Sequence, residues 1–591
     1  MSVIAATSHA PEHGYNDWAV TQFANLIEAL DAAPGDRLFI TAWIDEDEQE
    51  ALTFSAFRQA ARRQARELRQ HGVAAGDRVV IIMPQSVSAM TTFVGAMMLG
   101  TVPAFLAYPN FKVEPTKYRS GLAGVTANLG AKVVVIDEEF PDDLLGHVSL
   151  GLETTVVRAG RRPPSSTGGN SANESDPAAE QCGAPSSTSG LAFIQHSAGT
   201  TGLQKGVALT HAAVLRQIGY LQQALKIDGG SDCIYSWLPL YHDMGLIACF
   251  MLPMVCHVPV VMQSPLDWVM HPDTMLGIIT QHKCTLAWLP NFAFQFVPRR
   301  VPENWRSECD LSSVRALINC SEPVRASSMM EFQKAFAGAG LKAEALQSSY
   351  AMAEDVFAVT QSDVEAGPAK VWLDGASFRG AHRVVPVSSK TPGALPFVSS
   401  GRLLPNHGIR IVAESGAPDA ADEVGEILVK SDCLFEGYYN RPDLTESAII
   451  DGWYHTGDLG FYLDGELYVV GRKKDLLIIG GENIYPQDIE EIASGHPAIH
   501  DGRVIAMGVY NPELGTEEIV LVAEVGHGES LAGADEIERE IREKVVAGLG
   551  VAVRTILLKP PKWIVKSTAG KPARAATQEK LFREHPEWRS D

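Results

Sequence analysis

The sequence predicts an α/β fold in two parts: a large, doubly wound N-terminal α/β domain and a small, mobile C-terminal α+β domain. Through the first part of the chain, apolar helical stretches alternate with short buried strands, which is typical of a largely parallel sheet covered by helices. From about residue 475 the order changes to helix, strand, strand, helix and strand. We therefore expect an N-terminal domain over residues 1–471, a hinge near 472–475 and a C-terminal domain over 475–591.

Apolar periodicity locates the first elements of the large domain. It predicts a helix over residues 55–70 and, after a turn, a buried strand over 78–83. The longest apolar run, 246–262, is interrupted by Pro253 and His257. A membrane-spanning helix needs about 20 apolar residues, so this run predicts a buried helix or a pair of strands.

One stretch inside the large domain differs in composition from its surroundings. Residues 158–190 are rich in Ser, Gly, Pro and Ala and nearly lack large apolar side chains. Such a composition cannot bury a core, and a strand-like segment resumes directly after it. We expect a disordered loop there, at about 160–190.

Charge and cysteine content exclude several classes of protein. The chain carries 49 basic and 71 acidic residues, a net charge of −22, which disfavours nucleic acid and anionic membrane surfaces as partners. Its eight cysteines show neither metal-ligand spacing nor the density of a disulfide scaffold. The N-terminal residues lack a basic start and an apolar core, so we expect no signal peptide, reduced thiols and a cytoplasmic location.

The strongest local motif is IQHSAGTTGLQKG, a strand that leads into a loop before a helix. Glycines let the backbone approach phosphate oxygens, hydroxyls donate hydrogen bonds and a lysine supplies positive charge. The spacing is not that of the GxxxxGK[ST] nucleotide loop. From these residues alone, a flexible loop without a ligand remains the alternative.

This loop resembles the phosphate loop of the adenylate-forming superfamily, which includes acyl-CoA synthetases, fatty acyl-AMP ligases and peptide-synthetase adenylation domains. Further segments resemble the same enzymes in the same order, over about residues 20–580. They are SWLPLYHDMGL (236–246, similar to fatty acyl-AMP ligases in particular), SSYAMAED (348–355), GWYHTGDLG (452–460), GRKKDLLIIGGENIYPQDIE (471–490) and STAGKPAR (567–574).

The resemblance implies a role for each matching residue. The catalytic residues would be Lys571, bridging the substrate carboxylate and the α-phosphate, and His242, bordering the acyl entrance. Magnesium would be held by Glu354 and Thr200. The nucleotide would be bound by Ser197, Gly199, Thr200, Thr201, Gly202, Lys205, Ser321, Glu322, Pro323, Ser349, Tyr350, Ala351, Met352, Asp458, Arg472 and Lys474. Within this set, Tyr350 would stack on adenine, Asp458 would accept hydrogen bonds from the ribose and Lys474 would be the pivot of the hinge.

Each of these residues also has an ordinary structural interpretation. Taken alone, Tyr350 would be core packing, Asp458 a turn residue, Arg472 half of a surface ion pair and Lys571 a solvated lysine near the chain end. A lone histidine among apolar residues, such as His242, is more often structural. The ordered series of motifs is what favours the functional interpretation.

The implied reaction is the activation of a carboxylic acid, fatty or otherwise bulky and apolar. Its carboxylate and ATP would give an acyl-adenylate and pyrophosphate, and a thiol of CoA or of carrier-protein phosphopantetheine would then displace AMP. Because both first substrates are anions, magnesium and cations must offset their repulsion. The segment 371–412 resembles the insertion of fatty acyl-AMP ligases, which hinders the rotation that admits CoA, whereas GGENIYP at 480–486 is closer to CoA-using enzymes. The acceptor therefore stays open between CoA and an acyl carrier protein.

Two departures from the family pattern flank the expected adenine slot. Ala351 stands where relatives have Gly, and the turn Cys320-Ser321-Glu322-Pro323 stands where they have Gly-Ala-Glu-Pro or Gly-Gly-Glu-Pro. Crowding there suggests an alternative, an enzyme specialised for thioester formation from a preformed acyl-adenylate. A peptide-synthetase-like adenylation enzyme and a non-catalytic scaffold are further alternatives. Against the peptide-synthetase-like enzyme, this chain has no recognisable aspartate to bind an amino group. Against the scaffold, it keeps Lys571, Glu354 and Asp458, which a non-catalytic protein would not need.

Overall fold

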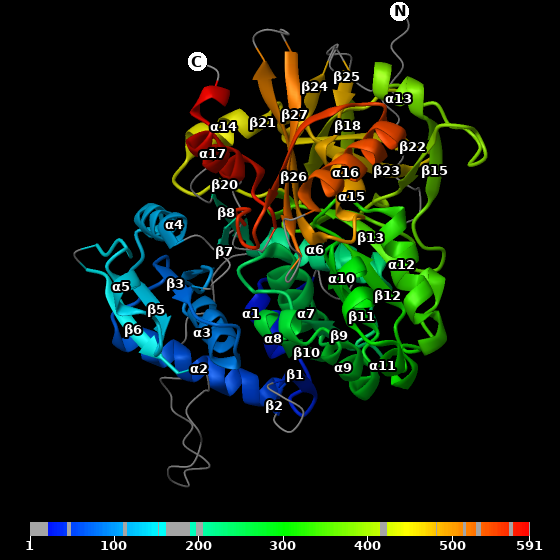
Figure 1. Ribbon diagram of the computed structural model, residues 1–591. Helices are drawn as coiled ribbons and strands as arrows, with labels where there is room; N and C mark the ends of the chain where they lie inside the picture. The colour runs from blue at the N-terminus through cyan, green and yellow to red at the C-terminus, as the bar shows by residue number, and fades with distance from the viewer. Residues whose placement is uncertain are drawn as a thin grey trace, which may run out of the picture.

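The two-part α/β prediction is confirmed by the computed structural model, in which a small lobe of late strands and helices, orange to red in Figure 1, sits on a larger body. The structure describes residues 22–43, 49–109, 115–151, 153–160, 190–196, 205–413, 422–479, 482–511, 516–526, 533–566 and 571–589.

A nine-stranded sheet forms the centre of the large body, in the order β17-β14-β13-β12-β11-β9-β10-β1-β2. Its strands are β1 (Leu38–Trp43), β2 (Gln49–Thr53), β9 (Ile234–Ser236), β10 (Val260–Gln263), β11 (Leu286–Leu289), β12 (Ala316–Asn319), β13 (Leu346–Ala351), β14 (Ala358–Gln361) and β17 (Arg402–Leu403). The strands from β1 to β13 run parallel, and the edges are closed by antiparallel pairs. Because parallel strands end at one edge, β9, β11, β12 and β13 deliver their following loops to one side of the sheet.

A second sheet, β4-β3-β5-β6, is parallel throughout. Its elements are β3 (Arg78–Ile82), β4 (Val102–Phe105), β5 (Val133–Asp137), β6 (Thr155–Ala159), α2 (Phe54–Gln70), α3 (Val87–Met98) and α4 (Pro115–Leu129). The predicted helix over 55–70 and strand over 78–83 correspond to α2 and β3. Helices α2 and α3 approach closely at Gly95, where a Cβ atom would lie 2.6 Å from the Ala61 carbonyl oxygen.

The apolar run at 246–262 is buried, as predicted. It belongs to the π-helix η2 (Met244–Met251), the short helix α7 (Leu252–Cys256) and strand β10. The described cysteines are free thiols, with the Sγ atoms of Cys233 and Cys284 3.7 Å apart. Most of the loop predicted at 158–190 lies outside the described residues, from 161 to 189.

Antiparallel sheets complete the large body and support the later motifs. They contain β7 (Leu191–His196), β8 (Gly206–Thr210), β15 (Lys370–Asp374), β16 (Ala394–Val398), β18 (His407–Val412), β19 (Gly425–Ser431), β20 (Gly437–Tyr438), β21 (Ile449–Ile450), β22 (Trp453–Leu463) and β23 (Glu466–Arg472). Helix α13 (Gly375–Ala381) lies between β15 and β16 in the chain. Within the described part of the chain, no helix is long and apolar enough to span a membrane.

The small lobe contains the predicted series of helix, strand, strand, helix and strand, with two short strands before it and a helix after it that were not predicted. It contains β24 (Leu477–Ile479), β25 (Glu482–Ile484), α15 (Pro486–Ser494), β26 (Ile499–Asn511), β27 (Thr516–Val525), α16 (Ala534–Leu549), β28 (Val553–Lys559) and α17 (Arg574–Glu584). Its own apolar core includes Ile489, Leu521 and Ile541, all fully buried. A separate core is what a lobe needs to move as a unit.

Candidate active site

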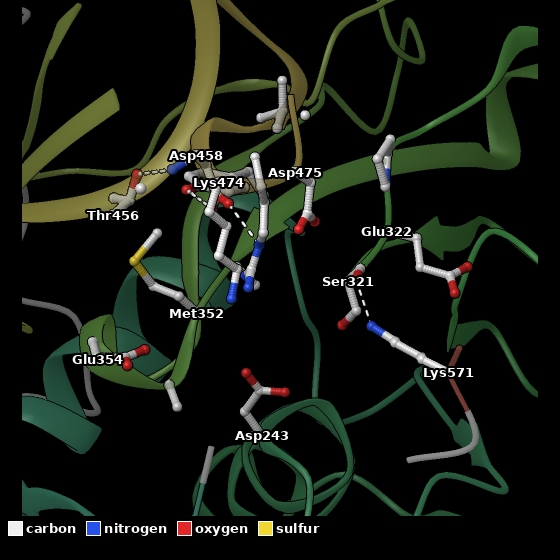
Figure 2. Close-up of a pocket in the computed structure, with 18 of the residues that line it drawn as sticks. Asp243, Ser321, Glu322, Met352, Glu354, Thr456, Asp458, Lys474, Asp475 and Lys571 are labelled. Carbon is white, nitrogen blue, oxygen red and sulfur yellow. Dashed lines mark hydrogen bonds and ion pairs between the residues drawn. The ribbon is translucent and has the colours of Figure 1, made fainter. Parts of the chain in front are cut away.

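A cavity of about 980 Å³ lies where the two lobes meet, and residues of both lobes line it. Figure 2 shows Ser321, Glu322 and Lys571 on one side, and Asp458, Lys474 and Met352 on the other. Of the residues predicted to bind nucleotide, the cavity wall contains Lys205, Ser321, Glu322, Pro323, Ser349, Tyr350, Ala351, Met352, Asp458, Arg472 and Lys474. His242, Glu354 and Lys571 also line it. The predicted loop residues Ser197, Gly199, Thr200, Thr201 and Gly202 lie outside the described residues.

Asp458 is a buried carboxylate at the centre of a polar network. The hydroxyl of Tyr350, on β13, donates a hydrogen bond of 2.6 Å to one carboxylate oxygen. Arg472 Nε lies 3.0 Å from the other oxygen, because β22 and β23 pair Asp458 directly with Arg472. The Asp458 charge raises the pKa of Arg472, and burial together with Asp458 raises the pKa of Tyr350. The network therefore keeps Tyr350 neutral and Arg472 charged.

Glu354 follows β13 in a tight turn, η5 (Ala353–Asp355). Its Oε1 accepts a hydrogen bond of 2.8 Å from the hydroxyl of Tyr438, and Lys205 Nζ lies 4.4 Å from the centre of that tyrosine ring. The next residue, Asp355, faces the core and lies 2.8 Å from His407 Nε2. Two adjacent acidic residues are thus separated, with Glu354 at the cavity and Asp355 fully buried.

The residues around Glu354 fit magnesium carried by a nucleotide. Magnesium prefers oxygen ligands and is usually bound by one or two carboxylates together with substrate phosphates. Glu354 offers a carboxylate at the cavity, and the described residues contain no group of three or more His, Cys, Asp or Glu side chains able to hold a metal alone. This donor set suits a metal that arrives with phosphates.

Lys571 reaches the cavity from the small lobe. Its Nζ donates a hydrogen bond of 2.5 Å to the carbonyl oxygen of Ser321, in the turn after β12 (Figure 2). Ser321 has a φ of +71°, a left-handed conformation that glycine adopts more readily. The preceding Cys320 packs in the core rather than lining the cavity, and burial raises its pKa to about 12. Of the departures predicted to flank the adenine slot, Ser321 and Ala351 line the cavity, whereas Cys320 does not.

Asp243 is a site residue that sequence reasoning missed. Figure 2 shows its carboxylate in the cavity region, between Glu354 and Lys571. One oxygen lies 2.5 Å from His242 Nδ1 and accepts the Met244 N–H at 2.7 Å. Burial alone would raise the pKa of Asp243, but His242, this N–H and Lys571 outweigh it and lower the pKa. The sequence signal that could have identified Asp243 is its position as an acidic residue directly before an apolar helix.

The segment predicted to resemble an insertion touches the small lobe. Helix α13 places Phe378 and His382 beside Tyr485, with ring centres 6.0 Å and 6.2 Å apart. Arg379, on the same helix, donates a hydrogen bond of 3.2 Å to the carbonyl oxygen of Gly548, at the end of α16. Tyr485 directly precedes α15, so this segment contacts the small lobe at the start of that helix.

The lobes also meet through an ion pair beside the Ser321 turn. Arg325 Nη1 lies 2.8 Å from Asp488 and 3.5 Å from Glu491, both on α15. Lys474 lines the cavity, and desolvation and Arg472 lower its pKa. The lobes therefore meet through ion pairs as well as through the ring contacts of Tyr485.

Comparisons with known proteins agree with this geometry. The chain is 28% identical over 570 residues to the long-chain-fatty-acid–AMP ligase FadD32 of Mycolicibacterium smegmatis, covering 89% of this chain and 88% of that protein. It is 29% identical over 554 residues to the 4-hydroxyphenylalkanoate adenylyltransferase of Mycobacterium marinum, covering 90% and 86%.

A solved structure from structural and functional studies of fatty acyl-adenylate ligases from E. coli and L. pneumophila superposes with a TM-score of 0.84 at 27% identity. The match covers 97% of this chain and 100% of that chain. The family model described as "AMP-binding enzyme" matches residues 26–439, well over half of the 591 residues. This chain therefore belongs to the AMP-binding enzyme family.

Proposed function

We propose that this protein activates a fatty or similarly apolar carboxylic acid with ATP and transfers the acyl group to a thiol. The observation that supports this best is the meeting of Lys571, from the small lobe, with the Asp458–Tyr350–Arg472 network in one cavity. A cation and a buried carboxylate face the same space from different lobes. This arrangement suits a nucleotide whose ribose and α-phosphate are held from opposite sides.

In the first half-reaction a carboxylate oxygen attacks the α-phosphorus of ATP, and the bond to pyrophosphate breaks. Asp458 accepts hydrogen bonds from the ribose hydroxyls, and Tyr350 lies against the base. Lys571 donates to the carboxylate and the α-phosphate, where negative charge accumulates in the transition state. Glu354 and the phosphates would hold magnesium, which would neutralise charge on the phosphate oxygens.

In the second half-reaction a thiol loses its proton to solvent, its sulfur attacks the acyl carbonyl carbon, and AMP leaves with the electron pair of the broken C–O bond. Rotation of the small lobe about Lys474 would withdraw Lys571 and open a path for the thiol. Among thiols we favour carrier-protein phosphopantetheine over CoA. The contacts of α13 with Tyr485 and Gly548 support this choice, because the resemblance implies that an insertion held against the small lobe hinders the rotation that admits CoA.

Pyrophosphate release with a series of carboxylic acids of increasing chain length tests the activation step. Absence of release with every acid would refute the proposed function. Thioester formation is then compared between CoA and a phosphopantetheinylated carrier protein.

The choice of acceptor has its own variant. Phe378→Ala with Arg379→Ala should release the small lobe and raise thioester formation with CoA relative to the carrier protein. Val385→Ala, in the same insertion at an exposed position, serves as the control. Wild-type preference for CoA, unchanged by the double substitution, would refute the carrier-protein assignment.

A further inference from the structure

A turn in the small lobe, a few residues before Lys571 in the chain, leads into the segment that carries this lysine. Strand β28 ends at Lys559, two prolines follow, and Lys562 then adopts a φ of +71°. A lysine in this left-handed conformation is strained, and such conformations persist only where their surroundings hold them. The chain leaving this turn leads directly to the segment that carries Lys571.

A buried carboxylate holds the strained turn. Glu524, near the end of β27, is fully buried and does not line the cavity. Its two oxygens accept the backbone N–H groups of Lys562 at 2.9 Å and Ile564 at 2.6 Å. Arg503 Nη1 lies 3.5 Å from the carboxylate and balances its charge. A buried carboxylate with these partners fixes two donors that a neutral side chain would leave partly unsatisfied.

A second set of bonds connects the turn to Lys571. Val565 donates its N–H to Thr577 Oγ1 at 3.2 Å and accepts the Ala573 N–H at 2.8 Å. An antiparallel bridge between Lys566 and Pro572 continues this pairing. Residues 572–573 thus pair with residues 565–566. Lys571 directly precedes the first pair, and the second follows the turn held by Glu524.

We propose that Glu524 is a positioning residue for Lys571 in adenylate formation, and this inference rests on the proposed function. Glu524 touches no substrate in this arrangement. It fixes the turn at Lys562, the turn fixes the arm at Val565, and the pairing with Ala573 directs the lysine Nζ to the Ser321 carbonyl. Displacing a catalytic group by about 1 Å can cost roughly a hundredfold in rate.

The test separates the two half-reactions. Glu524→Gln keeps the size of the side chain but replaces one acceptor oxygen with an amide NH₂ that faces a backbone N–H. Adenylate formation, measured by pyrophosphate release, should fall on the order of tenfold. Thioester formation from synthetic acyl-adenylate should be largely unchanged, because that step does not use Lys571. Glu518→Gln, at a residue of the same strand paired with Arg554 outside this turn, is the matched control and should leave both rates unchanged.

A double-mutant comparison tests whether Glu524 acts through the lysine. In a Lys571→Ala background, Glu524→Gln should cause no further loss of adenylate formation. Further loss there, an equal loss in both half-reactions of a folded protein, or no loss at all would each overturn the proposal. If Glu524→Gln does not fold, Thr577→Val applies the same test to the other arm and should give the same selective loss. A wild-type protein that releases no pyrophosphate would refute the proposed function instead.

Discussion

The two sides of the cavity are built differently. On the large body, Asp458, Tyr350 and Arg472 hold one another through short contacts between neighbouring strands. On the opposite side, Lys571 comes from the small lobe, and its Nζ donates a hydrogen bond to a backbone carbonyl of the large body. One side is preformed by strand pairing within the large body, whereas the other is supplied by the small lobe.

This difference separates binding from catalysis within one site. The preformed network would serve both half-reactions, because the ribose is present in ATP and in acyl-adenylate alike. The delivered lysine would serve the first half-reaction only. Substitutions in the network should therefore slow both half-reactions, whereas substitutions of the lysine should slow only the first. The size of the rate loss should differ as well.

The largest effect is expected on the delivered side. Lys571→Ala should lower adenylate formation by a factor on the order of 100 or more, because it removes a cation from the transition state. Thioester formation from supplied acyl-adenylate should be largely spared. Stopped assays of each half-reaction measure the two rates, and equal loss in both would contradict the comparison.

Asp458→Asn probes the preformed side. It removes the charge that Tyr350 and Arg472 share and that the ribose hydroxyls would meet. Hydrogen bonds to charged groups contribute about 1.5–3 kcal/mol, so KM for ATP should rise roughly tenfold to a hundredfold. Use of acyl-adenylate should weaken as well. Asp464→Asn, at the exposed turn of the same hairpin, is the control. Loss confined to the ATP-dependent step would contradict a shared ribose site.

Ala351 tests whether the preformed side is crowded. A methyl group added to a close-packed slot costs about 1–3 kcal/mol. If the slot is tight, Ala351→Gly should speed pyrophosphate exchange by up to roughly tenfold to a hundredfold, and thioester formation from synthetic acyl-adenylate should change less. Brisk exchange in the wild type, unimproved by the substitution, would exclude an enzyme specialised for the second half-reaction.

The smallest effect concerns the stability of the large body in acid. Burial lowers the pKa of His211 to about 4, and its Nδ1 accepts the Leu26 N–H at 3.4 Å. The unfolded chain has the ordinary histidine pKa of about 6.5 and binds the proton first. Stability is therefore complete above about pH 6.5 and is lost as the pH falls toward 4, by about 2 kcal/mol at pH 5.

Urea unfolding at pH 7 and pH 5 measures this loss. In His211→Asn the amide oxygen can replace the Nδ1 acceptor without titrating. The variant should lose less stability than the wild type between the two pH values. Equal losses would show that His211 does not contribute.

The sequence predicted the parts of the molecule that rest on local periodicity and on contiguous motifs. Helix α2, strand β3 and the series from α15 to β28 follow from spacing, breaks and apolar content, whereas β24, β25 and α17 were not predicted. Tyr350, Asp458 and Lys571, from three separate motifs, line the same cavity although they lie far apart in the chain.

The remainder depends on contacts that no local pattern records. Asp355 and His407 pair in the core because two distant segments meet there, and nothing near either residue marks the other. Glu524 looks like one more acidic residue on an alternating strand, yet it is buried against the backbone of a turn that starts beyond β28. The Cys320-Ser321 departure was visible, but only the structure shows that Cys320 points into the core.

The contact between α13 and Tyr485 also has a consequence in time. If acyl delivery requires a rotated lobe, each turnover has to break this contact and re-form it. Every 1.4 kcal/mol of contact free energy lowers the rotated population tenfold. A lobe that rotates seldom keeps the reactive anhydride enclosed, away from bulk water, until an acceptor arrives. The contacts of Phe378, His382 and Arg379 would then set how often the lobe rotates.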